Sequence, residues 1–496
     1  MSKERKNLLF LLGESHAPHL MGAAGNRVIK TPNLDALARR GAIFDAAYCA
    51  SPLCVPARAA IATGRYPHET GYWDSSMAFD GERMSWMRRL RDDGYETVGI
   101  GKMHFRSDDD DNGYSRFIDT MHIADGIGDL VSALRYKTEE PTYQGLWNIW
   151  TSQYGPGDSS PYRRYDERIV AEATDWLRTE ATTSAKPWAL SVHFIAAHAP
   201  FVTPQAFYDL YNPASLPPPP RFAIDERPNH PSAAHLRKTV CHQDDIAPEH
   251  VQQVRAAYFA TVSYLDDLIG RVLTALDHLG LAETTQVVYT SDHGFSCGDH
   301  GLFGLFHLYE ESLGVPLLMA GPDVPAGGRI ADPVSHVDLY PTILETCGVP
   351  LTEAERNADR ESLWRLIDGE AWRDSVFAEY HGTGTTAAGY VLRQGFWKLI
   401  YFVGMTPQLF NLAADPYEAN DLAHDPQHAA RLDAMIVKLQ QRVDPEAVDL
   451  KAKDDQRVLI ERHGGEAKVV EAMAGFAYSP PPGMSWRAVN APRKRQ

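Results

Sequence analysis

Residues 49–66 read CASPLCVPARAAIATGRY, and within them the pentapeptide CVPAR begins at Cys54 and ends at Arg58. Pro56 and the neighbouring proline and glycine restrict the backbone, while Arg58 supplies a permanent positive charge that can hold an anion. The Cys54 thiol is open to two interpretations, a small buried hydrophobe or a nucleophile. The segment is therefore the first candidate for chemistry in this chain.

Short apolar runs alternate along the chain with helical patterns, which is typical of strands covered by helices on both faces. The strand candidates are Asn7 to Leu12, Glu96 to Ile100, Trp188 to Ile195, Gln286 to Thr290 and Val315 to Ala320. The clearest helix runs from about His250 to Leu279, where apolar residues recur at helical spacing. We therefore predict an α/β fold with a large, mostly parallel sheet whose carboxyl edge binds the ligand.

The last quarter of the chain differs in character from the rest. It holds four short strand candidates and then an amphipathic helix, at Val376 to Glu379, Tyr390 to Arg393, Trp397 to Phe402, Gln408 to Asn411 and His428 to Val443. We expect a catalytic domain at residues 1–373, a small α+β domain with an antiparallel sheet at 374–445, and an extended tail at 446–496. The tail has little apolar core of its own, so we expect it to pack on a neighbouring subunit.

Charge and cysteine usage limit the partners and the compartment. The formal net charge of −17 argues against nucleic acid or an anionic membrane, but a local basic pocket can still bind a small anionic ester. Five cysteines, an odd number in a long chain, do not indicate a disulfide framework. The apolar run after Lys6 stops at Gly13, too short for a signal peptide or a membrane span. We therefore expect a cytoplasmic protein.

Polar side chains follow several of the predicted strands. Glu14 follows the first strand, and Asp292 and His293 follow the strand at Gln286 to Thr290. At one sheet edge these groups can bind a divalent cation, although an Asp-His pair can also serve as a helix cap. Lys102 and His104 follow a third strand and His198 follows a fourth, so these three residues are further candidates for the same site. A histidine titrates near neutral pH, which suits a general acid or base.

The chain resembles the type I sulfatases of the alkaline phosphatase superfamily, because further motifs of that family recur in order. They are Thr31-Pro32-Asn33-Leu34-Asp35, Tyr66-Pro67-His68, Gly298-Asp299-His300-Gly301-Leu302, Tyr309-Glu310-Glu311, and Pro407-Gln408-Leu409-Phe410-Asn411-Leu412 with Asp415-Pro416. Segments at Gly71 to Asp74, Ser85-Trp86 and Glu379 to His381, with the tail, are similar to the choline-sulfatase and phosphonate-monoester-hydrolase branch. The resemblance implies an alkaline-phosphatase-like sandwich.

The resemblance also implies a chemistry and roles for residues. Cys54 would be oxidised by a formylglycine-generating enzyme, and the hydrated aldehyde would be the nucleophile. Glu14, Cys54, Asp292 and His293 would bind a divalent metal ion, Ca²⁺ or Mn²⁺. Arg58 would stabilise the nucleophile, and Lys102 would contact it and the leaving group. His104 would take the diol proton, and His198 would assist the leaving group.

Three positions depart from the family pattern. Glu14 is followed by Ser15, the lysine expected about four residues before Tyr309 is Leu305, and an expected asparagine is Ser75. His307 is the nearest replacement for the missing cation. Ser15, Ser75, His307 and Glu379 are our substrate-binding candidates. One possible site for a cationic headgroup is a cage formed by Glu379 and four tryptophans, Trp73, Trp86, Trp147 and Trp150. The same residues can equally well be core or interface residues.

These features predict a metal-dependent hydrolase of sulfate esters. A phosphodiester or phosphonate monoester hydrolase would use the same groups, and the missing lysine at Leu305 keeps that alternative open. A third possibility is a catalytically weakened relative that only binds its ligand. The extended tail indicates a homodimer or homotetramer.

Overall fold

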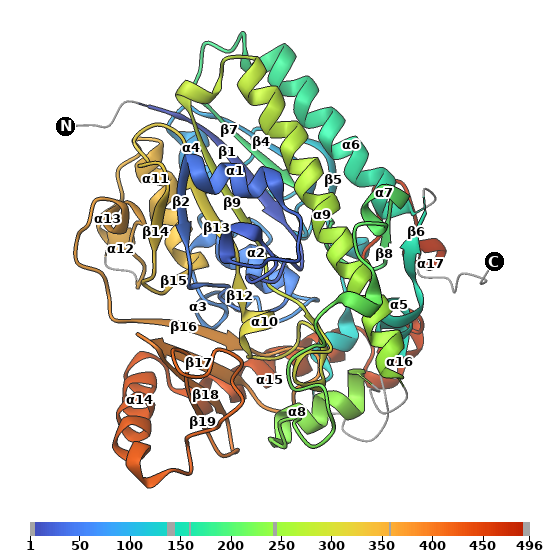
Figure 1. The fold of residues 1–496 in the computed structure, drawn as a ribbon. Helices are drawn as coiled ribbons and strands as arrows, with labels where there is room; N and C mark the ends of the chain where they lie inside the picture. The colour runs from blue at the N-terminus through green and yellow to red at the C-terminus, as the bar shows by residue number, and fades with distance from the viewer. Residues whose placement is uncertain (1–4, 136–143, 158–159, 242–245, 357–358, 490–496) are drawn as a thin grey trace.

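The computed structural model describes residues 5–135, 144–157, 160–241, 246–356 and 359–489, and a large mixed sheet lies at its centre (Figure 1). Across the sheet the strands are β14 (Gly328–Ile330), β2 (Gly41–Phe44), β13 (Leu317–Ala320), β9 (Thr285–Ser291), β1 (Asn7–Gly13), β7 (Trp188–His193), β4 (Glu96–Lys102) and β5 (Arg116–Met121). Only β13 runs antiparallel to its neighbours. The predicted mostly parallel sheet is confirmed.

All five predicted strand regions contain strands, with one interruption. The apolar run at 315–320 is divided between β12 (Gly314–Val315) and β13. Pro316 lies between the two strands, and a proline has no N–H to donate to a sheet ladder. β12 pairs instead with β3 (Ala47–Tyr48) in a separate small sheet that also contains β15 (Val334–Ser335).

Helices cover both faces of the large sheet. Alternate residues of its central strand point to opposite faces, so both faces present apolar side chains to the helices. Leu9 and Leu11 of β1 belong to one buried cluster, and Leu8 and Phe10 belong to another. The first cluster includes residues of α1 (Pro32–Arg40), α6 (Pro161–Trp176) and α9 (Pro248–His278). The second includes residues of α2 (Cys54–Thr63), α4 (Trp86–Asp92) and α11 (Leu339–Thr346). This is the predicted layered α/β architecture.

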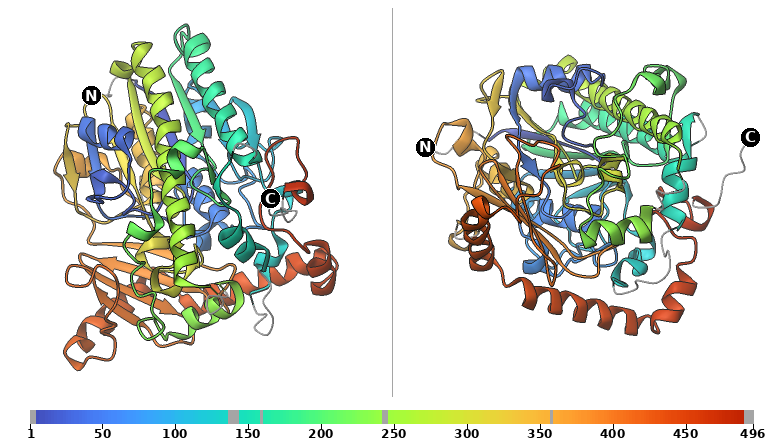
Figure 2. Two further views of the ribbon diagram at one scale, coloured as in Figure 1. Left: turned by 45° about the vertical axis from the view of Figure 1, so that its right-hand side comes forward. Right: turned by 60° about the horizontal axis from the view of Figure 1, so that its bottom comes forward.

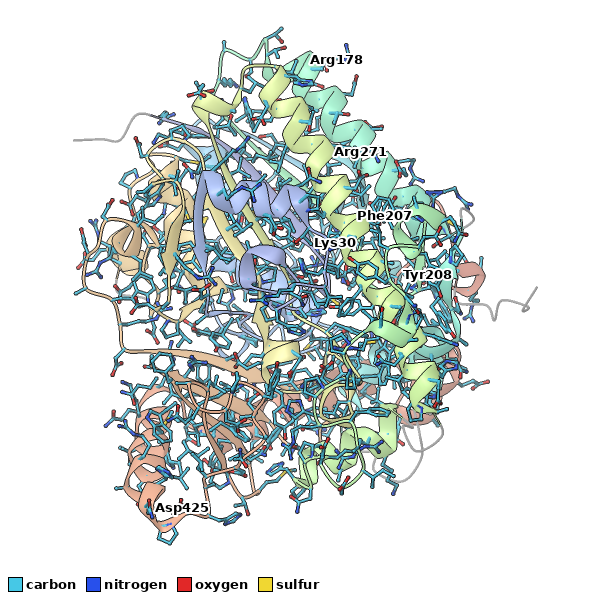
Figure 3. All side chains as sticks on the ribbon, in the orientation of Figure 1. Lys30, Arg178, Phe207, Tyr208, Arg271 and Asp425 are labelled. Atoms are coloured by element: carbon cyan, nitrogen blue, oxygen red, sulfur yellow. The ribbon has the colours of Figure 1, made fainter. Side chains whose placement is uncertain are left out.

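The helix predicted from about His250 to Leu279 is α9, which begins at Pro248. Proline suits the first helical position because the N–H it lacks would be unpaired there. α9 lies beside α6 along the sheet face (Figures 1 and 2). On the outer side Arg271 of α9, labelled in Figure 3, donates a 2.9 Å hydrogen bond to Glu167 of α6.

The predicted small antiparallel sheet is present below the large sheet in Figure 1. Its strands are β16 (Ser375–Tyr380), β17 (Gly389–Gln394), β18 (Trp397–Phe402) and β19 (Gln408–Asn411), and α14 (Ala429–Arg442) packs on it. Met435 and Leu439 of α14 share a buried cluster with Phe377 and with Ala60 of α2. The small sheet is therefore docked on the large part of the chain by apolar contacts.

The remaining strands and helices are short connectors. They are β6 (Tyr154–Pro156), β8 (Phe201–Thr203), β10 (Ser296–Cys297), β11 (Phe303–Gly304), α3 (Pro67–Thr70), α5 (Gln144–Ser152), α7 (Gln205–Tyr208), α8 (Pro231–Leu236), α10 (Glu310–Leu313), α12 (Glu353–Arg356) and α13 (Trp364–Ile367). None of the helices that the structure describes is both long enough and apolar enough to cross a membrane.

The C-terminal region returns from the small sheet to the large part of the same chain. It contains α15 (Pro445–Arg462), α16 (Glu466–Ala472) and α17 (Trp486–Val489), and Figure 2 (right) shows α15 and α16 along the edge of the molecule. The Arg135 guanidinium donates hydrogen bonds to Gln456 (2.9 Å) and Asp449 (3.1 Å) of α15. Packing of this region on a second chain stays a prediction.

Candidate active site

Four potential metal ligands converge at the carboxyl edge of the large sheet. Glu14 directly follows β1, Asp292 and His293 follow β9, and Cys54 is the first residue of α2. One ligand atom from each of the four lies within 4.8 Å of the others, and all four residues are buried. The Cys54 Sγ is 3.3 Å from Glu14 Oε1 and 3.1 Å from His293 Nε2. The structure thus brings together the four residues expected to bind a metal.

Two cations hold the carboxylates of this cluster. Arg58, one turn after Cys54 on α2, donates from Nε to Asp292 Oδ2 (2.9 Å) and from Nη2 to Glu14 Oε2 (3.3 Å). Lys102, the last residue of β4, forms an ion pair with Glu14. Burial opposes ionisation of Glu14, but Lys102 and other positive neighbours hold its pKa below the ordinary value. The two carboxylates of the cluster are therefore ionised and paired with cations.

The unmodified Cys54 thiol is not prepared for nucleophilic attack. Burial, followed by the charge of Glu14, raises its pKa well above the ordinary value. A reactive cysteine needs the opposite shift, because the thiolate is the nucleophile. The position is placed for chemistry, but the thiol itself stays protonated at neutral pH in this environment.

Two histidines complete the polar part of the site. Burial lowers the pKa of His198 to about 4, and its Nε2 is 3.5 Å from Glu14 Oε1. Burial and the charge of Lys102 lower the pKa of His104 well below its ordinary value. His104 has a φ of 58°, a left-handed conformation that is uncommon outside glycine and is often found at functional sites. Both imidazoles are neutral at neutral pH.

These groups open into a pocket with largely apolar walls. Its cavity volume is about 60 Å³, which leaves room for a compact group beside position 54. Its described lining residues are Leu53, Cys54, Val55, Ser75, Lys102, His104, Ile123, Asp129, Leu146, Trp150, His198, Leu305, Phe306, Thr383, Phe476, Ala477, Tyr478 and Ser479. The pocket thus combines titratable groups with a largely apolar lining, which is typical of sites for small organic molecules.

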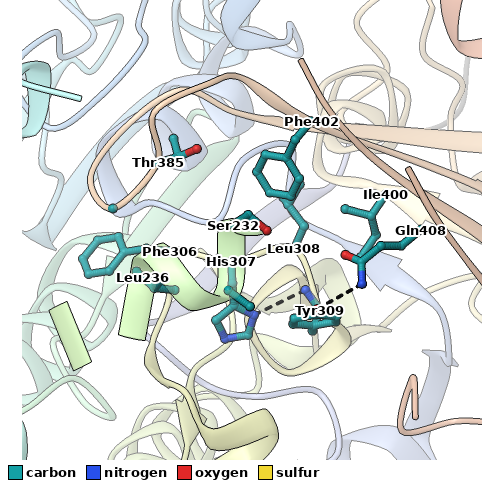
Figure 4. A pocket seen from close by; sticks show the side chains of 12 residues that line it. Ser232, Leu236, Phe306, His307, Leu308, Tyr309, Thr385, Ile400, Phe402 and Gln408 are labelled. Atoms are coloured by element: carbon teal, nitrogen blue, oxygen red, sulfur yellow. Dashed lines mark hydrogen bonds between the residues drawn. The ribbon is translucent and has the colours of Figure 1, made fainter. Parts of the chain in front are cut away.

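The substrate-binding candidates have different positions. Ser75 and Leu305 line the pocket, while the Ser15 N–H donates to Asp292 Oδ1 (3.3 Å). His307 lies in a different pocket, shown in Figure 4, where its Nε2 is 2.9 Å from Ser296 Oγ and its Nδ1 accepts from the Tyr309 N–H (3.3 Å). His307 therefore does not replace the missing lysine in this pocket.

The residues considered for a cationic cage do not assemble. Glu379 of β16 accepts hydrogen bonds from His68 Nδ1 and His381 Nε2, both at 2.9 Å, and does not line the pocket. Trp73 donates from Nε1 to Asp455 of α15 (2.8 Å). Of the four tryptophans, Trp150 is the one in the described lining of the pocket, and Trp73, Trp86 and Trp147 are buried elsewhere.

Several lining residues escaped sequence reasoning. The Tyr478 ring packs edge-on against His198 at 4.1 Å between centroids, and its hydroxyl accepts from Trp150 Nε1 (2.6 Å). Ser479 Oγ is 3.0 Å from His104 Nε2. These residues lie hundreds of positions after their partners, so no local pattern could indicate the contact.

His193 is a further residue near the cluster that was not predicted. It is the last residue of β7, and its Nδ1 is 3.4 Å from Arg58 Nη1. The rule that polar residues at strand ends meet at one sheet edge would have found it.

The comparison with protein families decides the classification. The Sulfatase family model matches residues 6–349, a range that contains the whole ligand cluster. The chain belongs to the sulfatase family. A model described as N-sulphoglucosamine sulphohydrolase, C-terminal, matches residues 298–444 of this sulfatase and includes the small sheet. The enzyme class is therefore that of a sulfuric ester hydrolase, as the resemblance predicted.

Relatives of this sulfatase agree with the classification. Choline-sulfatase of Rhizobium meliloti (strain 1021) is 30% identical over 490 residues, covering 97% of this chain and 94% of the relative. Human arylsulfatase K is 26% identical, covering 84% and 78%. The crystal structure of a phosphonate monoester hydrolase of Agrobacterium radiobacter has a TM-score of 0.70 at 23% identity, covering 88% and 95%. A putative sulfatase from Bacteroides thetaiotaomicron has a TM-score of 0.69 at 20% identity, covering 98% and 100%. The alkaline-phosphatase-like fold is confirmed.

Proposed function

We propose that this protein hydrolyses sulfate esters with a formylglycine made from Cys54 and a divalent metal ion bound beside it. The convergence of Cys54 with Glu14, Asp292 and His293 supports the proposal most directly. The raised pKa of the thiol adds to it, since an unmodified cysteine in this environment is a poor nucleophile. Formylglycine would supply a nucleophile that can release sulfate by breaking its own C–O bond.

The ligand set fits a divalent cation. Glu14, Asp292, His293 and the side chain at position 54 would hold the ion. The carboxylates suit Ca²⁺ or Mn²⁺, and the imidazole of His293 favours Mn²⁺, because Ca²⁺ prefers oxygen ligands. A bound dication supplies Lewis-acid polarisation of an ester oxygen. Arg58 keeps Asp292 aligned through its 2.9 Å hydrogen bond and adds positive charge beside position 54. Ser15, which follows Glu14, donates its backbone N–H to Asp292 Oδ1 at 3.3 Å.

The two histidines suit proton transfer in opposite directions. His104 Nδ1 is buried and has no hydrogen-bond partner among the described residues, so this neutral imidazole can accept a proton from the nucleophile. The carbonyl oxygen of Ala199, 2.5 Å from His198 Nδ1, holds a proton on that nitrogen. Nε2 of His198 therefore faces the cluster and, once protonated, can donate to the leaving oxygen. Lys102 can contact the same oxygen from the end of β4.

The phosphodiester or phosphonate monoester hydrolase is the second candidate. Leu305 lines the pocket where the family pattern has a lysine, and among the described lining residues no other cation takes its place except Lys102. Sulfate esters, phosphodiesters and phosphonate monoesters all carry one negative charge on the transferred group, so the loss of one cation leaves both candidates open. Turnover of matched aryl sulfate, phosphodiester and phosphonate esters separates the two candidates. A catalytically weakened binding relative would hydrolyse none of them.

Mass spectrometry of the peptide spanning Cys54 tests the central claim. The protein is expressed with a formylglycine-generating enzyme, the partner that we propose for its maturation. We expect the aldehyde at position 54, ester hydrolysis that depends on it, and neither in the Cys54→Ala protein. Full activity with an unconverted thiol would contradict the proposal.

We also propose a cytoplasmic location and a homodimer or homotetramer. The cysteines Cys49, Cys54, Cys297 and Cys347 are buried and free, which agrees with a reducing compartment. Light scattering coupled to gel filtration measures the subunit number, and fractionation of the source cells measures the location.

A further inference from the structure

Part of the pocket is an apolar wall, whose chemical character is opposite to that of the proposed metal ligands. Five residues with large apolar side chains, Leu146, Trp150, Phe306, Phe476 and Tyr478, line it together with smaller aliphatic groups. Trp150 and Tyr478 are held by a hydrogen bond from the indole N–H to the phenol oxygen, at 2.6 Å. Aromatic side chains have rigid faces that favour flat or compact apolar groups. Cys54 lines the same pocket, so the alcohol part of an ester bound at position 54 can contact this wall.

The charges around the wall are unsuited to a second anion. Among the described lining residues Lys102 is the one lysine or arginine, and it is already paired with Glu14. Asp129 also lines the pocket, and it accepts a hydrogen bond from the Val131 N–H at 3.0 Å. A carboxylate or second sulfate on the alcohol would therefore be buried with no cation to pair with and with Asp129 nearby. Burying an unpaired charge is costly.

The C-terminal segment that completes the wall is firmly held. Ser479 Oγ is 3.0 Å from His104 Nε2 and accepts from the Ala124 N–H at 3.2 Å. The Tyr162 hydroxyl donates to the Ser479 carbonyl oxygen at 3.0 Å. The Tyr478 ring contacts His198 edge-on. The segment is thus anchored on both histidines of the site, and its side chains are part of a preformed pocket.

We propose that this pocket selects sulfate esters of a compact, apolar alcohol, above all an aryl alcohol, that carries no second negative charge, and that Tyr478 determines this specificity. The inference rests on the proposed function and names the substrate class of that same site. The ring of Tyr478 forms part of the wall, and its hydroxyl accepts the hydrogen bond from Trp150 that helps to fix the ring. The ring is therefore the part whose removal should matter.

Two esters of similar size test the charge preference. The full-length, matured enzyme is assayed with 4-methylphenyl sulfate and with 4-carboxyphenyl sulfate. We expect kcat/KM to be about 100-fold higher for the methyl compound, the scale on which a site rejects a group that it cannot pair. Equal values, or a preference for the carboxylate, would overturn the inference.

Three variants test the role of Tyr478. Tyr478→Ala should lower kcat/KM for 4-methylphenyl sulfate by about 10-fold to 100-fold, chiefly through KM, because a hydrophobic contact is lost. Tyr478→Phe keeps the ring and should retain the preference for the methyl ester. Phe396→Ala removes an exposed aromatic side chain from the turn between β17 and β18 and is the matched control. Wild-type behaviour of Tyr478→Ala would remove Tyr478 from the proposal.

Binding measurements separate this inference from the proposed function. Calorimetry with the Cys54→Ala protein measures the affinity of the two esters without turnover. If wild-type enzyme hydrolyses no sulfate ester but the methyl compound still binds more tightly, the proposed function fails and the pocket assignment stands. If both esters are hydrolysed and bound equally well, the proposed function stands and the pocket assignment fails.

Discussion

Two buried clusters of histidine and carboxylate groups lie in the described part of the chain, and they differ in what surrounds them. The first holds Glu14, Cys54, Asp292 and His293 at the carboxyl edge of the large sheet. The second holds His300, Glu311 and Glu418, whose ligand atoms also lie within 4.8 Å of one another. By ligand spacing alone, either cluster could bind a metal ion.

The second cluster is part of an ionic joint between the small sheet and the rest of the chain. Lys398 of β18 is fully buried, and its Nζ lies 2.7 Å from Glu418 Oε1 and 2.8 Å from Glu310 Oε1. The Glu310 N–H donates to Glu418 Oε2 at 2.8 Å. Glu418 and Glu310 are thus paired with one lysine ammonium, while Glu311 Oε2 lies 3.4 Å from His300 Nδ1. Such a network joins segments that are distant in the sequence.

One feature separates the first cluster from the second. The first contains Cys54, a side chain that can become a nucleophile, whereas the second contains imidazole and carboxylate groups alone. Access to a cavity does not separate the two clusters, because Glu311 of the second also lines one. Convergent charge therefore does not by itself identify a catalytic site, and the reactive position beside it carries the distinction.

The largest expected effect comes from the first cluster. Cys54→Ala should lower kcat at least about 10⁴-fold, because removing a nucleophile leaves only binding and electrostatic effects. The free energy of unfolding should change little by comparison, and denaturant titration checks this. Glu418→Gln in the second cluster is the matched variant and should change stability far more than kcat per folded molecule. A reversal of these two outcomes would overturn the distinction between the clusters.

Metal content gives the next test. Elemental analysis of the purified protein should find about one divalent ion per chain, and chelation should lower kcat by 100-fold or more, roughly the loss of a major electrostatic contribution. Asp292→Asn should lose the ion, whereas Glu311→Gln should keep it. Two ions per chain, one of them lost in Glu311→Gln, would make the second cluster a metal site as well.

Loss of Lys398 should reveal the ionic joint. Lys398→Met leaves Glu310 and Glu418 buried without their cation, which should lower the free energy of unfolding by about 3–5 kcal/mol. The control is Lys451→Met, because Lys451 is 59% exposed in its pair with Asp455, and such surface pairs contribute about 0–1 kcal/mol. Urea denaturation measures both. Equal effects would show that Lys398 is not structurally important.

The smallest effect concerns the buried His68–Glu379 pair, 2.9 Å apart. Burial opposes protonation of His68, but Glu379 outweighs it and raises the pKa of His68 above 6.5. Its stabilising contribution is therefore complete below about pH 6.5 and is lost as the pH rises through the folded pKa. The pKa of Glu379 is lowered to about 2, so the pair also weakens in strong acid.

A His68→Gln variant measures this contribution. The difference in unfolding free energy from wild type should be about 1–2 kcal/mol near pH 5.5 and smaller near pH 8.5. A difference that grew with pH would contradict the assigned direction. Comparison with Lys398→Met then ranks a histidine pair against the ionic joint.

Local sequence patterns predicted the strands of the large sheet and the polar residues of the candidate site that follow them. The strands were recognisable because buried parallel strands are continuous apolar runs, and the residues that follow them must meet at one edge. That reasoning placed Glu14, Lys102, His198 and Asp292 correctly in space. The family resemblance, and not composition or spacing, assigned their chemical roles.

The apolar half of the site could not be read from the sequence. Tyr478 and Ser479 reach His198 and His104 only because α15 and α16 carry the chain back to the large sheet. His307 was misplaced because the chain bends at Leu305 and again at His307, so the two side chains enter different pockets. Both outcomes depend on the tertiary path, which no local pattern contains.

The return of the C-terminus to position 54 has a consequence for how the protein is made. A ribosome that has reached residue 475 has already produced every proposed metal ligand and both histidines of the site, but not Tyr478 or Ser479. Until this last segment is made and has folded onto the large sheet, the pocket lacks part of its wall. A premature stop before Tyr478 would also remove the contacts that hold His104 and His198.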